Sequence, residues 1–450
     1  MTVSETAATG ETVRLAGFCA ELTLDDVDEE ARTAAESAIA DLVAACYAGT
    51  DTDAGEIAVR YAESLGGDEA TVVGGGRALA HFAALANGTT AHGLDVDDGH
   101  RAASAHPGAA VIPASLAAAE KHGASGADLV VAVVAGYEAA IRTAVSVQTS
   151  HRKRGFHATA TVGCIGAAAA VGSILGLERE GMADAIGLGG TQAGGLFEFM
   201  AKGSMSKRFH GGRAALAGVL AGELAAEGFD GPDTIIEGED GFARAFADEY
   251  DLSPFESLGD PYAVTEAYIK PYPSCRHVHG PMEAAFEFRE EIPPERVESI
   301  RIETYESAAK HDKRAVENLL DAQMSAPYSV AVAGVTGEGG LAQSDPPSDD
   351  PTVRRLAERP TVVASDDMEA AYPATRPARV VVETTDGERR ETLVEYPLGS
   401  KERPISEENL RKKFHDLVGE RVSEERRGRV LDAALSMSAV EDVSSFAAEL

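Results

Sequence analysis

Residues 161–175 read Thr-Val-Gly-Cys-Ile-Gly-Ala-Ala-Ala-Ala-Val-Gly-Ser-Ile-Leu, a run of small and apolar side chains without a charge. Small side chains let neighbouring helices approach closely, so this run predicts a helix inside a tightly packed helical core. No strand is predicted before Gly163, Gly166 and Gly172. We therefore interpret these glycines as packing positions and not as a dinucleotide-binding loop.

Apolar residues recur at helical spacing through most of the first 250 residues, and Gly49 marks the end of one of the predicted helices. Besides the run above, helices are expected over residues 29–47, 78–85, 109–122, 127–147 and 213–227. This part of the chain therefore reads as helix after helix.

The pattern changes near residue 265. Residues 297–304 alternate apolar and polar side chains as a strand does. Residues 379–395 predict a β-hairpin that turns at Asp386-Gly387. Helices are expected at 280–290, 324–335, 406–418 (capped by Ser406) and 424–450, and a loop at 338–350.

These patterns predict a mainly α protein with two domains, because a chain of 450 residues is too long for one core. We expect a large all-helical domain over residues 1–265 and a smaller α+β domain over residues 266–423. The helices of residues 424–450 are expected to return to the first domain.

The chain is acidic, with 74 Asp and Glu against 40 Lys and Arg and a formal net charge of −34. Such a charge repels nucleic acid and anionic membranes, and an anionic substrate needs a local cationic pocket. The charge is spread along the whole chain, and only 10 of the 40 basic residues are lysines. We interpret this composition as adaptation to a halophilic cytosol.

Other sequence features favour a cytoplasmic protein. No run of about 18 uncharged apolar residues is present, so no membrane-spanning helix is expected. Residues 1–14 are polar and acidic and lack the features of a secretory signal. The four cysteines form no Cys-x-x-Cys pair, which disfavours a zinc ribbon or a dithiol redox site. Cys275 falls near a candidate site but is interpreted as a small buried thiol.

Ionisable residues gather beside glycines and prolines in four blocks, at the ends of predicted elements, where catalytic residues are often mounted. The first block, residues 92–107, reads His-Gly-Leu-Asp-Val-Asp-Asp-Gly-His-Arg-Ala-Ala-Ser-Ala-His-Pro. Asp95, Asp97 and Asp98 repel one another, so a cation, a metal or a helix N-terminus must offset them. Asp97 and Asp98 are as easily explained as surface residues. Asp95 follows an apolar leucine among histidines, and we assign it to a pocket.

Two histidines precede predicted helices. His106 comes just before Pro107 and the helix at 109–122, and His157 comes before the run at 161–175. Because helix N-termini attract anions, the two histidines together predict a cradle for a carboxylate.

Cationic side chains occupy the other two blocks. Lys207 and Arg208 precede an alanine-rich helix, and the lysine is either a surface residue or a ligand of a substrate carboxylate. The last block supplies Lys270, Arg276, His277 and His279, stiffened by two prolines. His277-x-His279 is a weak metal signal without a third ligand.

Jointly these motifs resemble the MmgE/PrpD family, which includes 2-methylcitrate dehydratase, cis-aconitate decarboxylase and iminodisuccinate epimerase. The matching stretches are residues 92–107, 155–157 (Gly-Phe-His), 207–210 (Lys-Arg-x-His), 228–232, 237–242 and 272–279. The resemblance implies a helical domain with a smaller α+β lid and a homodimer. It also implies chemistry without metal or cofactor in a cleft between the domains.

The resemblance further implies which residues act. Asp95, His106, His157, Lys207 and His277 fall where the family's active-site residues lie, and Tyr328 corresponds to an active-site tyrosine. One departure bears on the substrate: many members carry threonine where this chain has Gly99, followed by His100 and Arg101.

We therefore predict a lyase that removes a proton from the carbon α to a carboxylate in a small di- or tricarboxylate. His106 or His157 is the base, Asp95 orients a histidine, and His277 protonates a leaving hydroxyl. The substrate-binding residues are expected to be Lys207, Arg208, Lys270, Arg276, Tyr328 and His100.

The sequence leaves the reaction open. Dehydration of 2-methylcitrate is preferred on family breadth, and decarboxylation of cis-aconitate or epimerisation of iminodisuccinate would use the same cleft. A Mg²⁺-dependent prenyl-diphosphate enzyme is disfavoured because a second aspartate cluster is missing. A non-catalytic paralogue is disfavoured by the retained His, Lys and Asp set.

Overall fold

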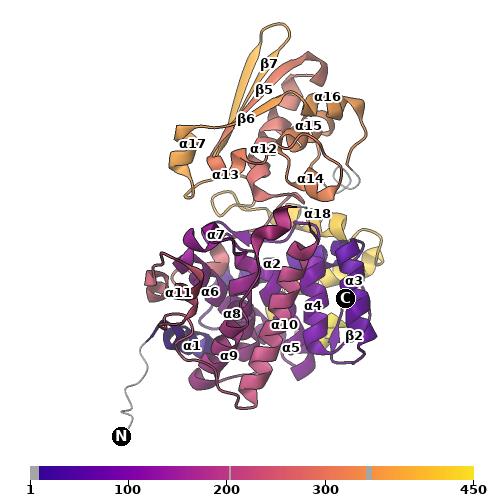
Figure 1. Ribbon diagram of the computed structural model, residues 1–450. Coiled ribbons are helices and arrows are strands. Elements are labelled where there is room, and N and C mark those ends of the chain that lie inside the picture. The colour runs from indigo at the N-terminus through magenta and orange to yellow at the C-terminus, as the bar shows by residue number, and fades with distance from the viewer. Residues whose placement is uncertain (1–9, 202–203, 341–346) are drawn as a thin grey trace. The chain divides into compact units, whose positions relative to one another are not determined.

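The computed structural model describes residues 10–201, 204–340 and 347–450, and the chain divides into two compact units. Unit 1 comprises Met1–Ile269 and Ser406–Leu450, and unit 2 comprises Lys270–Ile405. In Figure 1, unit 1 runs from indigo to magenta and ends in yellow, whereas unit 2 is mostly orange.

Unit 1 is built from helices, with only two short β-ribbons in its described part. Its first helices are α1 (Glu11–Glu21), α2 (Glu29–Gly49), α3 (Asp53–Ser64), α4 (Ala80–Ala91), α5 (Gly108–His122), α6 (Gly126–Val147) and α7 (Ser150–Lys153). Then come α8 (Ala158–Ile174), α9 (Arg179–Thr191), α10 (Ser206–Ala226), α11 (Phe242–Phe246), α18 (Glu407–Val418), α19 (Glu424–Ala434) and α20 (Val443–Ala447). The ribbons pair β1 (Ala70–Thr71) with β2 (Arg77–Ala78), and β3 (Gly99–His100) with β4 (Ala267–Tyr268).

The alanine- and glycine-rich run forms α8, which lies at the centre of unit 1 as predicted. Every residue from Ala158 to Gly172 is buried. The helix packs against α5, α6, α9 and α10, which are labelled around it in Figure 1.

Close approach between helices explains why glycines occur inside them. A Cβ atom on Gly88 of α4 would lie 2.7 Å from the Cα atom of Gly212 of α10. A Cβ atom on Gly166 of α8 would lie 2.7 Å from the carbonyl oxygen of Gly136 of α6. Glycine inside a helix costs about 1 kcal/mol relative to alanine, and here no larger residue fits without moving backbone. The sequence-based interpretation of α8's glycines as packing positions agrees with these contacts.

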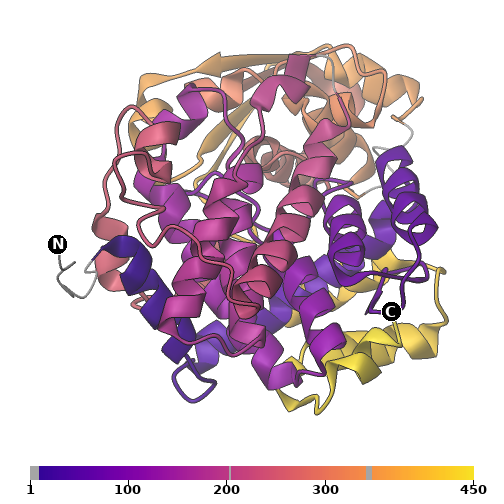
Figure 2. The same ribbon diagram turned by 60° about the horizontal axis from the view of Figure 1, so that its bottom comes forward.

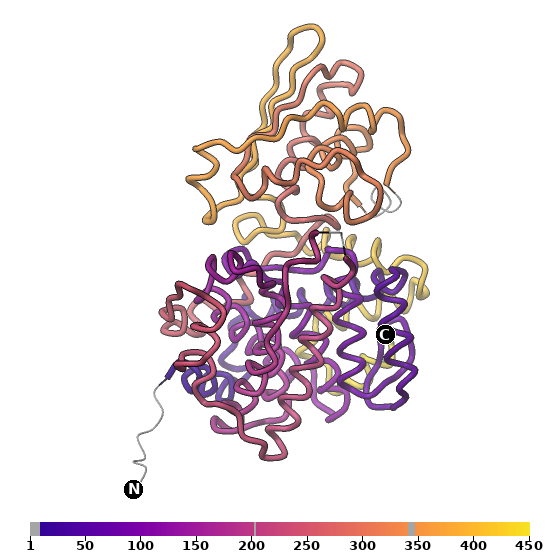
Figure 3. The backbone as a smooth tube through the Cα atoms, in the orientation of Figure 1, coloured from indigo at the N-terminus to yellow at the C-terminus, as the bar shows by residue number. Residues whose placement is uncertain are grey.

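The C-terminal segment belongs to unit 1, and Figures 2 and 3 show its yellow trace alongside the helices of this unit. The segment joins unit 1 at Ser406, earlier than the Glu424 that we expected, because α18 packs against α2. Ser406 accepts a hydrogen bond from the backbone N–H of Asn409, which confirms its predicted cap. The prediction of helices over residues 424–450 is confirmed by α19 and α20. α19 ends at Ala434, and Asp442 caps the separate helix α20.

Unit 2 packs helices on a four-stranded sheet of order β6-β5-β7-β8. Its strands are β5 (Val297–Thr304), β6 (Pro360–Ala364), β7 (Ala378–Thr384) and β8 (Arg389–Val394). Its helices are α12 (Arg276–Glu291), α13 (Glu306–Ala309), α14 (Leu319–Gln323), α15 (Ala326–Thr336), α16 (Pro351–Ala357) and α17 (Asp366–Ala371). α12 and α15 bury their apolar faces in one core with β5 and β7.

The sheet confirms the predicted hairpin of β7 and β8, whose turn places Gly387 at φ 86°. β6, which pairs parallel to β5, was not predicted. Residues 341–346 of the predicted loop at 338–350 lie outside the described residues. The prediction of a mainly α protein is confirmed, whereas a lid function for unit 2 stays a prediction.

Among the described helices, α6 alone is long and apolar enough to cross a membrane by length and composition. Nearly all of that stretch is buried inside the protein, as in the core helix of a globular domain.

Lys413 of α18 links the returning segment to the rest of unit 1. Its buried ammonium pairs with Asp41 of α2 and donates to the carbonyl oxygen of Val96 at 2.8 Å. Lys413→Met should lower the free energy of unfolding by about 3 kcal/mol, because it leaves a buried carboxylate without its cation. Urea denaturation measures this loss.

The neighbouring Lys412→Met is the matched control, because Lys412 pairs with Asp416 on the surface and should lose less than about 1 kcal/mol. The double variant Asp41→Asn, Lys413→Met should lose less than Lys413→Met alone, since it buries no charge. Equal losses for Lys412→Met and Lys413→Met would contradict the assignment.

Candidate active site

The segment between α4 and α5 carries three aspartates into the interior of unit 1. Every residue from His92 to His100 is buried, although the segment contains only the two-residue strand β3. Asp95 adopts φ 55°, a left-handed conformation that non-glycine residues rarely hold. Such backbone conformations persist where the surrounding structure imposes them, and they concentrate at functional sites.

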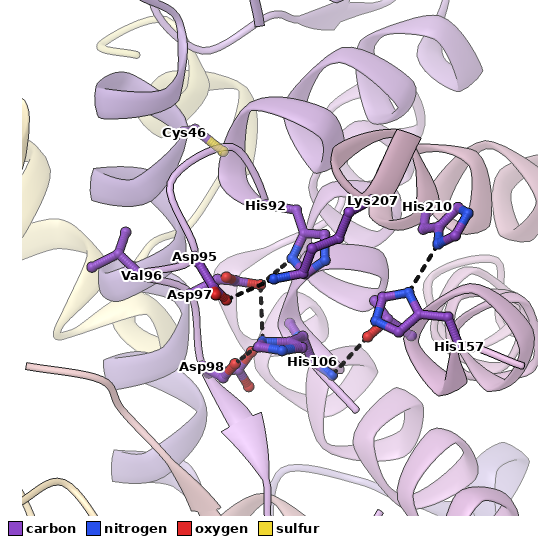
Figure 4. Close-up of polar contacts among 12 residues, drawn as sticks. Cys46, His92, Asp95, Val96, Asp97, Asp98, His106, His157, Lys207 and His210 are labelled. Carbon is purple, nitrogen blue, oxygen red and sulfur yellow. Dashed lines mark hydrogen bonds and ion pairs between the residues drawn. The ribbon is translucent and has the colours of Figure 1, made fainter. Parts of the chain in front are cut away.

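Asp97 is shared by two histidines. Its Oδ2 atom lies 2.7 Å from Nδ1 of His92 and 3.3 Å from Nδ1 of His106 (Figure 4). Burial alone would raise the pKa of Asp97, but the two histidines hold it well below its usual value. Asp97 is therefore an ionised carboxylate in the interior. From the sequence, a surface position had explained Asp97 equally well.

The same contacts fix the two imidazole rings. Burial lowers the pKa of His92 to about 3, so this ring is neutral at ordinary pH. His106 donates from Nδ1 to the carbonyl oxygen of Asp98 at 2.6 Å, and its backbone N–H donates to Thr159 Oγ1 at 3.1 Å. Since Nδ1 of His106 carries this proton, Nε2 is the atom at which the ring can exchange one.

Asp98 is a buried carboxyl with neutral donors. It accepts hydrogen bonds from Tyr137 Oη at 2.8 Å and from the backbone N–H of Gly108 at 3.1 Å. Burial, aided by the charge on Asp97, raises the pKa of Asp98 to about 7. The pKa values of the two adjacent aspartates thus shift in opposite directions, because histidines contact the carboxylate of Asp97 but only the backbone carbonyl of Asp98.

Asp95 forms an ion pair with Lys207 at the start of α10, with 2.9 Å between Oδ1 and Nζ. Both side chains are buried, as is the neighbouring Arg208, whose charge is stabilised by Asp95 and Asp97 against the effect of burial. The alternative of a surface lysine at 207 is thereby excluded. The pair places an ammonium group beside the histidines, as Figure 4 shows.

His157, at the N-terminus of α8, completes the cluster. Its Nδ1 atom lies 2.9 Å from Nδ1 of His210, and its ring stacks on His92 with 5.9 Å between centroids. Burial, reinforced by His92, holds the pKa of His157 well below its usual value, and burial lowers that of His210 to about 4. Both rings are therefore neutral at ordinary pH.

The structure thus brings together Asp95, His106, His157 and Lys207 from segments up to about a hundred residues apart, as the motifs predicted. Three members were not assigned to the site from the sequence: His92, Asp97 and His210. Each lies inside a quoted motif, so the signal was present. What the sequence lacked was the evidence of burial.

His100, which we expected to bind substrate, is held by its own segment. Its Nδ1 atom accepts a hydrogen bond from the backbone N–H of Ala103, and Nε2 lies 4.0 Å from Glu266. Next to it, Gly99 faces Tyr268 of β4, and a Cβ atom at 99 would lie 2.5 Å from Tyr268 Oη. The tyrosine occupies the space that a threonine at 99 would need.

The other predicted residues lie in unit 2. Lys270 is fully buried, and Tyr328 Oη accepts a hydrogen bond from the backbone N–H of Ser348 at 2.7 Å. His277 is half-buried, with Nδ1 2.5 Å from Tyr305 Oη. The Arg276 guanidinium donates to the carbonyl oxygens of Pro397 and Leu398 and to Ser400 Oγ. This geometry favours a structural role for Arg276 over the substrate contact that we expected.

One group of unit 1 has the donor set of a metal site. Donor atoms of His92, Asp97 and His106 lie within 4.8 Å of one another. Both imidazoles, however, already direct Nδ1 to oxygen atoms, so an ion bound through these atoms would have to displace those hydrogen bonds. The arrangement supports proton transfer and anion binding more directly.

Comparison with known proteins gives matches over most of the chain. The MmgE/PrpD N-terminal domain matches residues 13–254, and the MmgE/PrpD C-terminal domain matches residues 272–437. Cis-aconitate decarboxylase of Aspergillus terreus (strain NIH 2624 / FGSC A1156) is 29% identical, over 97% of this chain and 95% of its own. The cis-aconitate decarboxylase-like protein oryM of Aspergillus oryzae is 28% identical, over 100% of this chain and 99% of its own sequence. Cis-aconitate decarboxylase of Homo sapiens is 29% identical, over 57% of this chain and 55% of its own sequence.

The protonation of Asp98 should affect stability as pH changes. Between an unfolded pKa near 4 and the folded value of about 7, the folded state holds a proton that the unfolded state has lost. This proton stabilises the fold at low pH, and the stabilisation disappears as pH rises through about 7. Wild type should therefore lose stability relative to Asp98→Asn from pH 4 to 8, by as much as about 4 kcal/mol. Urea unfolding of both proteins across this range measures the difference.

Asp230→Asn, which changes an exposed carboxylate of the same unit, is the control and should run parallel to wild type. A pH-independent difference between wild type and Asp98→Asn would show that Asp98 is ionised throughout.

Proposed function

Because this chain is a lyase of the MmgE/PrpD family, we propose that it decarboxylates cis-aconitate to itaconate. The observation that carries this proposal is the similarity, over nearly the whole of both chains, to proteins named cis-aconitate decarboxylase. Our preference for dehydration of 2-methylcitrate rested on family breadth, and these relatives favour the decarboxylase alternative instead.

The reaction requires one proton and an acceptor for negative charge. The bond between the methylene carbon and its carboxylate breaks, and CO₂ leaves. The electron pair forms a new double bond to the central carbon, while the old double bond shifts its electrons to the carbon beside the third carboxylate. That carbon takes up the proton. The transition state places negative charge next to a carboxylate, and fixed cations lower its energy.

His106 is the proton donor in this proposal. Nδ1 of its ring donates to the carbonyl oxygen of Asp98 and lies 3.3 Å from the ionised Asp97, so Nε2 is the atom from which the ring can deliver a proton. Delivery from Nε2 leaves a neutral imidazole, which takes a proton back from water. His157, neutral through burial, can hydrogen-bond to substrate without adding charge.

Lys207 is the cation of unit 1 that we assign to a substrate carboxylate. Asp95 holds the ammonium in place at 2.9 Å, and an ammonium group has three donors to direct. The pair fixes the geometry before substrate arrives, and such preorganisation is a large part of electrostatic catalysis. For Lys270, His277 and Tyr328 of unit 2, a contact with substrate stays a prediction from the sequence.

Proton NMR in D₂O with the purified protein tests the reaction. Incubation with cis-aconitate should give itaconate that carries one deuterium on its saturated methylene carbon, because the donated proton comes from an exchangeable group. A vinyl signal produced from 2-methylcitrate, with cis-aconitate untouched, would favour the dehydratase. Deuterium exchange into iminodisuccinate without net conversion would favour the epimerase.

Substitution at the cluster tests the roles. His106→Gln and Lys207→Met should each lower kcat/KM for cis-aconitate by at least about a hundredfold, as the loss of a general acid or of a fixed charge does. His122→Gln and Lys121→Met are matched controls at the end of α5, where Lys121 pairs with Glu223 at 2.8 Å. Full activity of Lys207→Met would remove the lysine from the mechanism.

A further inference from the structure

Unit 2 contains a second group of side chains of the types that bind metal ions. Sγ of Cys275 and ring nitrogens of His277 and His311 all lie within 4.8 Å of one another. All three residues are half-buried and so within reach of solvent. Cys275 is therefore not the buried thiol that we expected from the sequence. His311 was not among the residues that the sequence analysis singled out.

Hydrogen bonds orient the two imidazoles as they do in metal sites. His311 donates from Nδ1 to the carbonyl oxygen of Met324 at 3.0 Å, which makes Nε2 the nitrogen with the lone pair. That Nε2 atom lies 3.9 Å from Sγ of Cys275. His277 directs Nδ1 to Tyr305 Oη at 2.5 Å, and with Nδ1 as the donor the lone pair of this ring lies on Nε2 as well. Ligating histidines in proteins typically engage their other ring nitrogen in this way.

Local structure also favours a thiolate and fixes its position. Cys275 is the N-cap residue of α12, a helix of 16 residues, and the N-terminus of a helix stabilises negative charge. Its backbone N–H donates to the carbonyl oxygen of Gln323 at 2.9 Å. His277 and His311 stack with 5.3 Å between ring centroids, and the His277 partner Tyr305 stacks on Tyr372.

The His277-x-His279 pair suggested by the sequence does not form this site. His279 accepts a hydrogen bond from Arg276 through Nδ1 and donates through Nε2 to the carbonyl oxygen of Ser274. Both of its nitrogens are thus engaged, and the residue is fully buried. The third ligand comes instead from His311, 34 residues after His277.

We propose that Cys275, His277 and His311 bind a divalent cation of the Zn²⁺ class. A site of one thiolate and two imidazoles binds ions of this class more tightly than it binds Mg²⁺ or Ca²⁺. Tetrahedral bond lengths place the ligand atoms about 3.3–3.6 Å apart. The present spacing is within 4.8 Å, and 3.9 Å between Cys275 and His311, so the side chains must move closer together to bind an ion. Three protein ligands leave a fourth position for water or a carboxylate oxygen.

A bound ion would affect turnover, and this consequence rests on the proposed function. Coordination would occupy Nε2 of His277, a residue that we assign to the substrate. The site would therefore inhibit and not catalyse, with the cation competing against the productive complex. Metal binding itself is measured without turnover, so either idea can fail alone.

Titration of the reduced, chelator-treated protein with Co²⁺ tests the site. One equivalent should bind and give thiolate-to-cobalt charge-transfer absorption, because Cys275 is the sulfur ligand. Cys275→Ser should lose this absorption, and His311→Gln should raise the Kd at least about tenfold. Cys19→Ser, which changes a buried cysteine of unit 1, should match wild type.

Two results would overturn the proposal: no stoichiometric binding, or binding without charge-transfer absorption, which would place the ion at the sulfur-free group of His92, Asp97 and His106. Alkylation of the wild-type protein gives a measure that needs no variant. Saturating Zn²⁺ should slow iodoacetamide modification of Cys275, followed by mass spectrometry. An unchanged rate would equally contradict thiolate ligation.

Discussion

The burial of three carboxylates within four residues is the constraint on which the site depends. An ionised carboxylate in the interior costs many kcal/mol unless cations or hydrogen-bond donors lie beside it. A different group stabilises each aspartate. Lys207 pairs with Asp95, two imidazoles contact Asp97, and a bound proton neutralises Asp98. The residues that offset these charges are the residues that chemistry on a carboxylate needs.

These partners come from distant parts of the chain and meet because the helices of unit 1 pack closely. His157 stands at the start of α8 and Lys207 near the start of α10, two helices that lie against each other. Lys413 of the C-terminal segment also reaches the buried loop, through the carbonyl oxygen of Val96. The packing of alanine and glycine therefore fixes the distances between the charged groups of the candidate site.

The sequence predicted the parts of the fold that depend on local patterns. α8 and the β7–β8 hairpin follow from small-residue periodicity and from Asp386-Gly387. β6 was missed because its five residues carry no alternation of their own and pair only through tertiary contact. The bounds of α19 and α20 could not be predicted, because the signals between them, a serine and a capping aspartate, are weak against a helical background.

The candidate site was predictable to a similar depth. His106, His157 and Lys207 could be assigned because they precede helices in recognisable motifs. The burial of Asp97 could not, since it depends on histidines folded around it, nor could the engagement of Arg276 by the backbone of a loop more than a hundred residues later. A sequence identifies ionisable groups, but their charge states follow from partners that only the fold supplies. The homodimer, the cytoplasmic location and the salt adaptation stay predictions.

The composition of the helical core restricts how this protein can change over evolutionary time. In most protein cores, a substitution that removes a methyl group at one position can be compensated by one that adds a methyl group at another. In α8, four consecutive alanines, Ala167 to Ala170, follow Gly166, which lies against α6, so within this stretch almost no side chain remains to be shortened. Most substitutions in this stretch therefore enlarge a side chain. A larger side chain pushes the helices apart and displaces the residues at their ends. Selection on the chemistry thus acts on positions far from any reacting atom.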